Sequence, residues 1–139
     1  MTTKLNFKQS IMAGLMAAGA ATVVNAILFY IFHAAGIIVD TIFIQPNQPL
    51  TVVPIVISSI VPTLIATLVF FLFEKYTNNG FKIFRIISLV LMTLSFVNPF
   101  IGIHGVTMGY AIVLNIMHVV VVGALLHFIG KSVKSISTN

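Results

Sequence analysis

Residues 53–73 read VPIVISSIVPTLIATLVFFLF, a run that contains no Asp, Glu, Lys or Arg. A helix needs about 20 consecutive apolar residues to cross the hydrocarbon core of a bilayer. Similar runs cover about 11–33, 84–103 and 109–130. The pattern therefore predicts an all-α membrane protein, a four-transmembrane-helix bundle that forms one integral membrane domain over residues 1–139.

The composition of the whole chain fits a lipid environment. Hydrophobic residues make up 59% of the sequence and charged residues 6%, with a mean hydropathy of +1.15. A soluble domain carries about 25% charged residues, and a soluble chain this apolar would expose large sticky patches. The segments outside the four runs leave no room for a soluble catalytic domain of ordinary size.

The first run, 11–33, has basic residues before it, as a secretory signal peptide has. Its apolar stretch is longer than the about 7–15 residues of a signal peptide's hydrophobic region. We therefore expect a retained helix.

The basic residues predict the direction of the four helices. Cytoplasmic loops and tails of membrane proteins carry an excess of Lys and Arg. Here all seven fall before the first run, around the inner loop 74–83 or in the tail 131–139, and the outer loop 34–52 has none. The sequence thus predicts a multi-pass protein with both termini cytoplasmic (N-in/C-in). The formal charge of +5 is explained by this topology, so no nucleic-acid partner is expected. The basic residues are Lys4, Lys8, Lys75, Lys82, Arg85, Lys131 and Lys134.

The outer loop has an unusual composition. Residues 37–44 and 50–53 are rich in β-branched residues, and the segment QPNQP at 45–49 between them has turn chemistry. Residues 37–53 therefore form either a short extracellular β-hairpin over the bundle or an irregular interfacial loop. The polar tail 132–139 is expected to fray.

Polar side chains within the runs are the candidate site, because lipid offers them no hydrogen-bond partner. Each run contributes at least one at a similar depth in the middle or outer half of the membrane. They form either a ligand-binding pocket with the histidine at its base or a layer of interhelical hydrogen bonds. The Ser and Thr hydroxyls can also bond their own helix. The pocket candidates are His118, Asn115, Asn25, Asn98, Ser95, Ser59 and Thr63.

Catalytic and metal motifs are not found. The chain has no cysteine, no P-loop, no HExxH, no GxSxG and no carboxylate inside the four runs. His33 and His104, at outer helix ends, could ligate a haem only if their helices adjoin. We therefore expect no catalytic residue, no metal and no cofactor.

Two segments resemble a known family. The run FRIISLVLMTLSFVNP at 84–99 resembles the third helix of the DUF6069 family, and NIMHVVV at 115–121 resembles its last helix. Asp40 in the first outer loop also fits, whereas Phe84 stands where many members have Trp. The resemblance implies a small bacterial four-helix membrane protein of unassigned function, located in the cytoplasmic (inner) membrane. It also singles out Ser95, Pro99 and His118.

Three functional hypotheses follow. The first is a non-enzymatic bundle that binds a small apolar or amphipathic, lipid-like ligand, or a membrane protein partner, in the polar pocket. The second is a channel or transport subunit formed by a homo-oligomer. The third is a lipid- or quinone-directed membrane enzyme with His118 as acid/base, which the absence of an intramembrane carboxylate weakens.

Overall fold

The computed structural model describes residues 4–45, 48–102 and 106–137. Among these, four helical stretches are long and apolar enough to cross a membrane, so the prediction of four membrane-length helices is confirmed. The third stretch, Gly80–Ile101, contains two helices. The elements are α1 (Phe7–Ala34), β1 (Phe43–Gln45), β2 (Gln48–Pro49), α2 (Val52–Tyr76), α3 (Gly80–Ser95), α4 (Asn98–Gly102) and α5 (Met108–Ser137).

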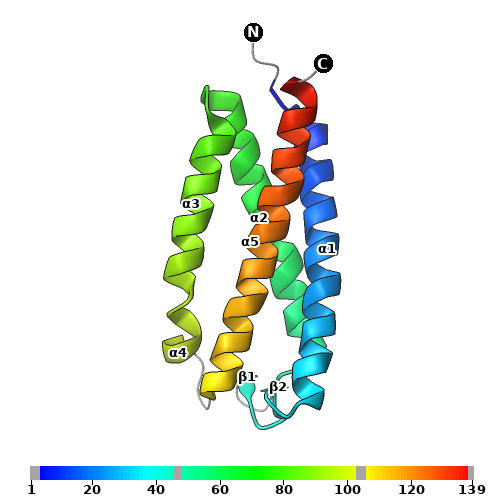
Figure 1. Ribbon diagram of the computed structural model, residues 1–139, viewed down its shortest axis with the longest axis vertical. Coiled ribbons are helices and arrows are strands. Elements are labelled where there is room, and N and C mark those ends of the chain that lie inside the picture. Colours follow the sequence, from blue (N-terminus) through cyan, green and yellow to red (C-terminus); the bar gives the residue numbers. More distant parts are fainter. Residues whose placement is uncertain (1–3, 46–47, 103–105, 138–139) are drawn as a thin grey trace.

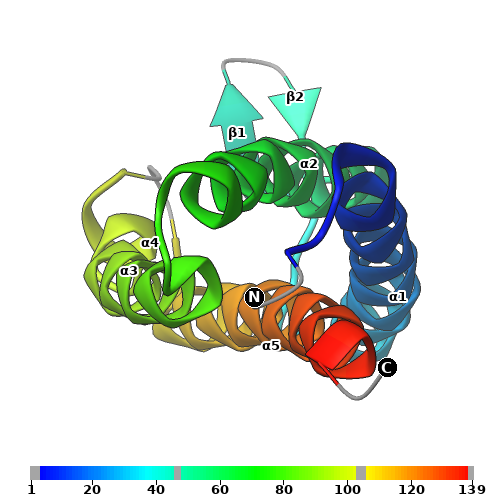
Figure 2. The same cartoon turned by 90° about the horizontal axis from the view of Figure 1, so that it is seen from above.

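The four long helices form a ring, which we call the helix ring (Figure 2). Helix α1 packs against α2 and α5, and α3 packs against the same two helices from the opposite side. The start of α1, the α2–α3 turn and the end of α5 lie at one end of the ring (Figure 1). All seven Lys and Arg residues lie on these segments, so we call this end the basic end and the other the loop end.

Helix α1 begins earlier than the predicted residue 11 because of a capping box. The Asn6 side chain accepts a hydrogen bond from the Gln9 backbone N–H (2.9 Å), and the Gln9 side chain accepts one from the Asn6 N–H (3.0 Å). These bonds satisfy two donors that a helix start leaves unpaired. At the same end, Lys4 Nζ donates to the backbone oxygens of Lys75 and Thr77 at the end of α2.

Helix α5 continues past the predicted end at residue 130, so the expected fraying of 132–139 is wrong for the described part of the tail. Val133 and Ile136 pack against a buried cluster at the basic end that includes Leu5 and Ile129. Their spacing of three residues places both on one face of the helix. This apolar face extends the helix into the polar tail.

The predicted third span, 84–103, is not one continuous helix. Helix α3 ends at Ser95 and α4 starts at Asn98, while residue 103 lies outside the described residues. Pro99 has no N–H to donate to the Ser95 carbonyl, so the i to i−4 hydrogen bond that would continue α3 across this point cannot form. The break therefore falls where the Asn98-Pro99 pair enters the helix.

Of the two alternatives for residues 37–53, the β-hairpin over the whole segment is not supported. Strands β1 and β2 pair antiparallel with an irregular register, but residues 37–42 and 50–51 are outside strands, and α2 starts at Val52. Ile38, Ile42 and Leu50 instead lie in a buried cluster at the loop end. Burying each such side chain contributes about 1.5–3 kcal/mol, more than strand propensity does. The expected turn residues 46 and 47 lie outside the described residues.

The size of the side chains at the contacts determines how closely the helices approach. Helix α1 faces α2 and α5 with small buried residues, including Gly14 and Ala17, which allow close backbone contact. Helix α3 is close to α2 at its first residue, Gly80, and beyond it faces inward with larger residues such as Phe84 and Met92. Within an 18-residue apolar window of each span, 11% of the residues are buried for Gly80–Ile101, against 28% for α1 and for α2. The interior next to α3 is consequently less tightly filled.

Candidate functional site

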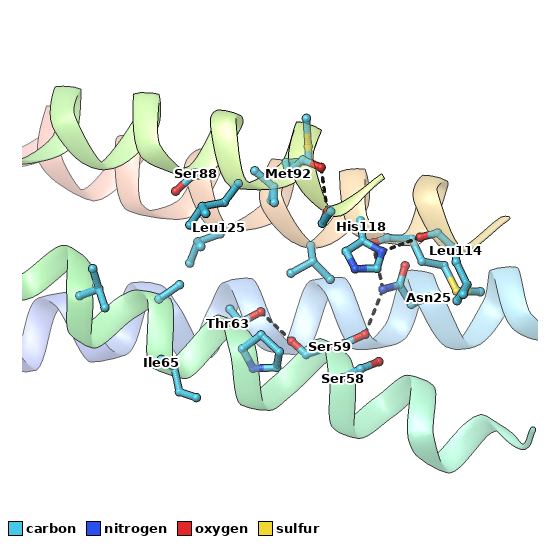
Figure 3. Close-up of a pocket in the computed structure, with 18 of the residues that line it drawn as sticks. Asn25, Ser58, Ser59, Thr63, Ile65, Ser88, Met92, Leu114, His118 and Leu125 are labelled. Carbon is cyan, nitrogen blue, oxygen red and sulfur yellow. Dashed lines mark hydrogen bonds between the residues drawn. The ribbon is translucent and has the colours of Figure 1, made fainter. Parts of the chain in front are cut away.

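A cavity of about 490 Å³ lies inside the helix ring, between α2, α3 and α5; we call it the central cavity (Figure 3). Helix α1 contributes one lining residue, Asn25. Most lining side chains are aliphatic or aromatic, and the cavity is partly open. Its polar or ionisable lining residues are Asn25, Ser58, Ser59, Thr63, Ser88, Ser95 and His118.

Each lining helix presents one face to the central cavity. On α3, for example, the lining residues include Phe84, Ser88, Leu91 and Ser95, which recur at intervals of three and four. Residues at this spacing share one side of an α-helix. Arg85 and Thr93 of the same helix are exposed. Ser88 and Ser95 therefore face the cavity together with the apolar residues at the same spacing.

Asn25 connects three helices at the loop-end half of the cavity. Its side chain is 2% exposed, and Nδ2 donates to Ser59 Oγ of α2 (3.0 Å) and to the Met117 carbonyl of α5 (3.3 Å). A carbonyl can only accept, so this bond fixes which amide atom is the nitrogen. The amide oxygen, Oδ1, is buried with no partner among the described residues. Such an unpaired buried acceptor costs about 1–3 kcal/mol.

His118 faces the cavity from α5, one residue after the Met117 carbonyl that binds Asn25. Its Nδ1 lies 2.8 Å from the Leu114 carbonyl oxygen. Because that oxygen can only accept, Nδ1 carries the proton, and in the neutral imidazole Nε2 is an acceptor. Nε2 has no hydrogen bond to any residue in the described ranges.

The hydroxyl groups of α2 bond mainly to their own helix. Ser59 donates to the Ile55 carbonyl (2.8 Å), Thr63 to that of Ser59 (2.6 Å) and Thr67 to that of Thr63 (2.7 Å). Serine and threonine hydroxyls commonly satisfy themselves in this way within helices. Of these hydroxyls, that of Ser59 also accepts from Asn25 and so takes part in contact between helices.

The polarity of the cavity changes along its length. Asn25, Ser58, Ser59 and His118 lie in the half toward the loop end (Figure 3). Toward the basic end the lining is apolar apart from Ser88 and includes Val69, Phe84 and Leu125. The central cavity is thus amphipathic, with a polar half and a mainly hydrocarbon half.

Five of the seven predicted pocket residues line the cavity, and two do not. Asn98 is exposed at the start of α4. Asn115 lies three residues before His118, but its Nδ2 donates to the Phe96 carbonyl (3.2 Å), just after α3 ends. Residues three apart on a helix point about 60° from each other, enough for Asn115 to reach the break in the third span. The five lining residues are Asn25, Ser59, Thr63, Ser95 and His118.

Two polar lining residues, Ser58 and Ser88, were absent from the predicted pocket. The seven-residue spacing of Ser88 and Ser95 places them on one face, and this signal could have identified Ser88. Ser58 donates to the Ile55 carbonyl (3.0 Å), and its position in the sequence gives no comparable signal.

No group of three or more His, Asp or Glu side chains that could hold a metal occurs within residues 4–45, 48–102 and 106–137. His33 pairs with Asp40 at the loop end (Nε2–Oδ1 3.0 Å), and both are exposed. His104, the other histidine considered as a haem ligand, lies outside the described residues.

Comparison with known proteins assigns the chain to a family. No curated protein and no solved structure matches it. A family model described as "Family of unknown function (DUF6069)" matches residues 6–135, nearly the whole chain. The helix ring and the central cavity are therefore features of a chain that belongs to the DUF6069 family.

Proposed function

We propose that this chain is a multi-pass protein of a bacterial cytoplasmic membrane and that it binds a lipid-like amphipathic molecule in the central cavity. The membrane part rests on four membrane-length helices with apolar outer faces. The orientation rests on the seven Lys and Arg residues at the basic end, since such residues stay on the cytoplasmic side.

The orientation can be tested with single cysteines because the chain has none of its own. Asn78 is exposed in the α2–α3 turn, and Asp40 is exposed in the α1–α2 connection. We expect a membrane-impermeant maleimide to label Asp40→Cys in cells whose outer membrane is permeable, and Asn78→Cys only after the inner membrane is opened. The opposite pattern, or labelling of both in intact spheroplasts, would refute the N-in/C-in topology.

The central cavity is the observation that carries the ligand proposal. Its volume of about 490 Å³ falls within the ~300–1,000 Å³ of typical ligand pockets. It is about three times the engineered ~150 Å³ cavity that binds benzene, so it has room for roughly 20 non-hydrogen atoms. A ligand with a polar head and a hydrocarbon part matches its two halves.

The polar residues favour this proposal over a pore formed between copies of the chain. Asn25, Ser59, Thr63 and Thr67 are all buried inside the helix ring. The outward-facing residues of the helices are largely hydrophobic, as in Ile27, Ile57 and Val90. A channel between subunits would need polar groups on these outer faces.

The environment of His118 favours binding over acid–base catalysis. An imidazole that acts as a general base is commonly oriented by a carboxylate. Here the Nδ1–H donates to the Leu114 carbonyl of the same helix. Asp40, the acidic residue of the first outer loop, is paired with His33.

A cavity-filling substitution tests the ligand proposal. Val122 lines the cavity, whereas Val119, on the same helix, is 46% exposed and does not line it. We expect native mass spectrometry of the protein, purified in mild detergent, to detect a retained lipid-like species. Val122→Phe should reduce the retained fraction about tenfold because the ring occupies the ligand's volume, and Val119→Phe should leave it unchanged. If the parent protein retains nothing, or Val122→Phe retains as much as Val119→Phe, the cavity is not a ligand site.

A further inference from the structure

We infer that the ligand of the central cavity is a single-chain lipophile whose head is a hydrogen-bond donor, such as a neutral hydroxyl group, and that this head lies toward the loop end. The inference rests on the proposed ligand function and specifies its chemistry. It depends on unpaired hydrogen-bonding groups at the polar half of the cavity, which are predominantly acceptors.

The first acceptor is Asn25 Oδ1. It is buried and has no partner among the described residues, and the amide cannot flip because Nδ2 donates to the Met117 carbonyl. Figure 3 shows the amide oxygen directed away from Ser59 and toward the helix that carries His118. A ligand donor at this position would satisfy an acceptor that otherwise stays unpaired in a medium of low dielectric constant.

The second acceptor is Nε2 of His118. The bond from Nδ1 to the Leu114 carbonyl fixes the neutral tautomer, so the nitrogen left for the cavity has a lone pair and no proton. The Met117 carbonyl that binds Asn25 belongs to the preceding residue, so Asn25 and His118 are neighbours at this level of the ring. One hydroxyl group placed between them could donate to either.

The third acceptor is the backbone carbonyl of Ser58. Its usual partner in the helix is the N–H four residues later, but that residue is Pro62, which has no N–H. Both Ser58 and Pro62 line the cavity. The proline thus leaves a carbonyl oxygen available at the same polar half.

The hydroxyl groups that line the polar half of the cavity already donate hydrogen bonds within the protein. The hydroxyls of Ser58, Ser59 and Ser95 donate to backbone carbonyls of their own helices. Ser88, whose hydroxyl has no hydrogen-bond partner among the described residues, lies toward the basic end with apolar neighbours. An anionic head such as a carboxylate needs donors and would meet acceptors here, so it should be rejected.

The shape of the cavity specifies the hydrocarbon part. Ile55 and Val69 both line it from α2 and are fourteen residues apart, which corresponds to about 21 Å along the helix. A volume of about 490 Å³ spread over that length suits a narrow, extended occupant. With the head near Asn25, the chain would run beside Ile65 toward Phe84 and Leu125.

Three probes with the same sixteen-carbon chain test the inference: hexadecanol, hexadecyl methyl ether and hexadecanoate. Their binding to the full-length protein in lipid nanodiscs is measured by native mass spectrometry titration. We expect hexadecanol to bind about tenfold more tightly than the ether, which keeps an oxygen but has no donor, and more tightly than hexadecanoate. His118→Leu should reduce the preference for alcohol over ether to about threefold or less. His127→Leu, an exposed position on α5 outside the cavity lining, should leave it intact.

The outcomes separate this inference from the proposed function. If none of the three probes binds, the ligand-binding function itself fails. If the alcohol and the ether bind equally, or hexadecanoate binds best, the cavity is a ligand site but the requirement for a donor is wrong. A preference for the alcohol that survives His118→Leu unchanged would overturn the assignment of His118 as an acceptor.

Discussion

Gly14→Ala is expected to destabilise the protein by about 1–3 kcal/mol, the usual cost of overpacking a tightly filled contact. A Cβ atom at this position would overlap the Oγ1, Cγ2 and Cβ atoms of Thr67 on α2. The hydroxyl of Thr67 also donates to the Thr63 carbonyl, so its rotation would break that bond. The two helices would therefore have to move apart. Unfolding in mixed detergent micelles with increasing sodium dodecyl sulfate, followed by circular dichroism, gives the measurement.

Gly19→Ala is the matched control for Gly14, because no atom lies within 4 Å of a Cβ built at Gly19. Gly19→Ala should not destabilise the protein, and the higher helix propensity of alanine should raise the free energy of unfolding by up to about 1 kcal/mol. The double variant Gly14→Ala/Thr67→Gly moves the small residue from α1 to α2. It should recover part of the stability that Gly14→Ala alone loses. Equal stability of the two single alanine variants would contradict the close α1–α2 contact.

Gly80→Ala is expected to lower the free energy of unfolding by as much as Gly14→Ala does, or by more. The added Cβ would lie 2.5 Å from the Cα of Glu74 and 2.6 Å from its backbone nitrogen. Backbone atoms cannot move aside by a change of rotamer, so the α2–α3 turn would have to open. Because α3 is anchored closely to α2 here and packs loosely beyond it, we expect α3 to lose its alignment with the ring. The same unfolding measurement should show a loss of about 2 kcal/mol or more.

Gly123→Ala on α5 is the control for Gly80, since a Cβ there meets nothing within 4 Å. It should be neutral or slightly stabilising. If Gly80→Ala alone reduces ligand retention while both variants remain folded, the position of α3 determines the shape of the central cavity. Unchanged stability and retention in Gly80→Ala would show that the turn is not tightly packed.

The sequence predicted the four membrane-length helices because hydropathy is a local property that sums along each run. It missed the capping box of Asn6 and Gln9, which extends α1, and the packing of Val133 and Ile136, which extends α5. For 37–53, strand propensity suggested a hairpin as one of two alternatives, but burial of Ile38 and Ile42 at the loop end outweighed that propensity. In each case a contact with a neighbouring or distant residue changed the result.

The candidate site was predicted in part for the same reason. Polar groups within apolar runs were visible in the sequence, and five of the seven line the cavity. Helical spacing does not determine which neighbour a side chain meets, so Asn115 was a pocket candidate together with His118 although its side chain bonds to the Phe96 carbonyl. The unpaired acceptor of Asn25 was likewise invisible, because it follows from what Ser59 and Met117 leave unsatisfied.

The sequence by itself determined that this protein has four membrane-length helices. It also determined that the Lys and Arg residues lie around the second connection and in the two terminal segments, since both are properties of consecutive residues. Only the tertiary structure decided that there is a cavity and where its polar half lies. The small residues of α1 bring it close to α2 and α5, while the bulky inward residues of α3 hold that helix away beyond Gly80. The space left between them depends on contacts among four helices at once, and no single segment encodes it.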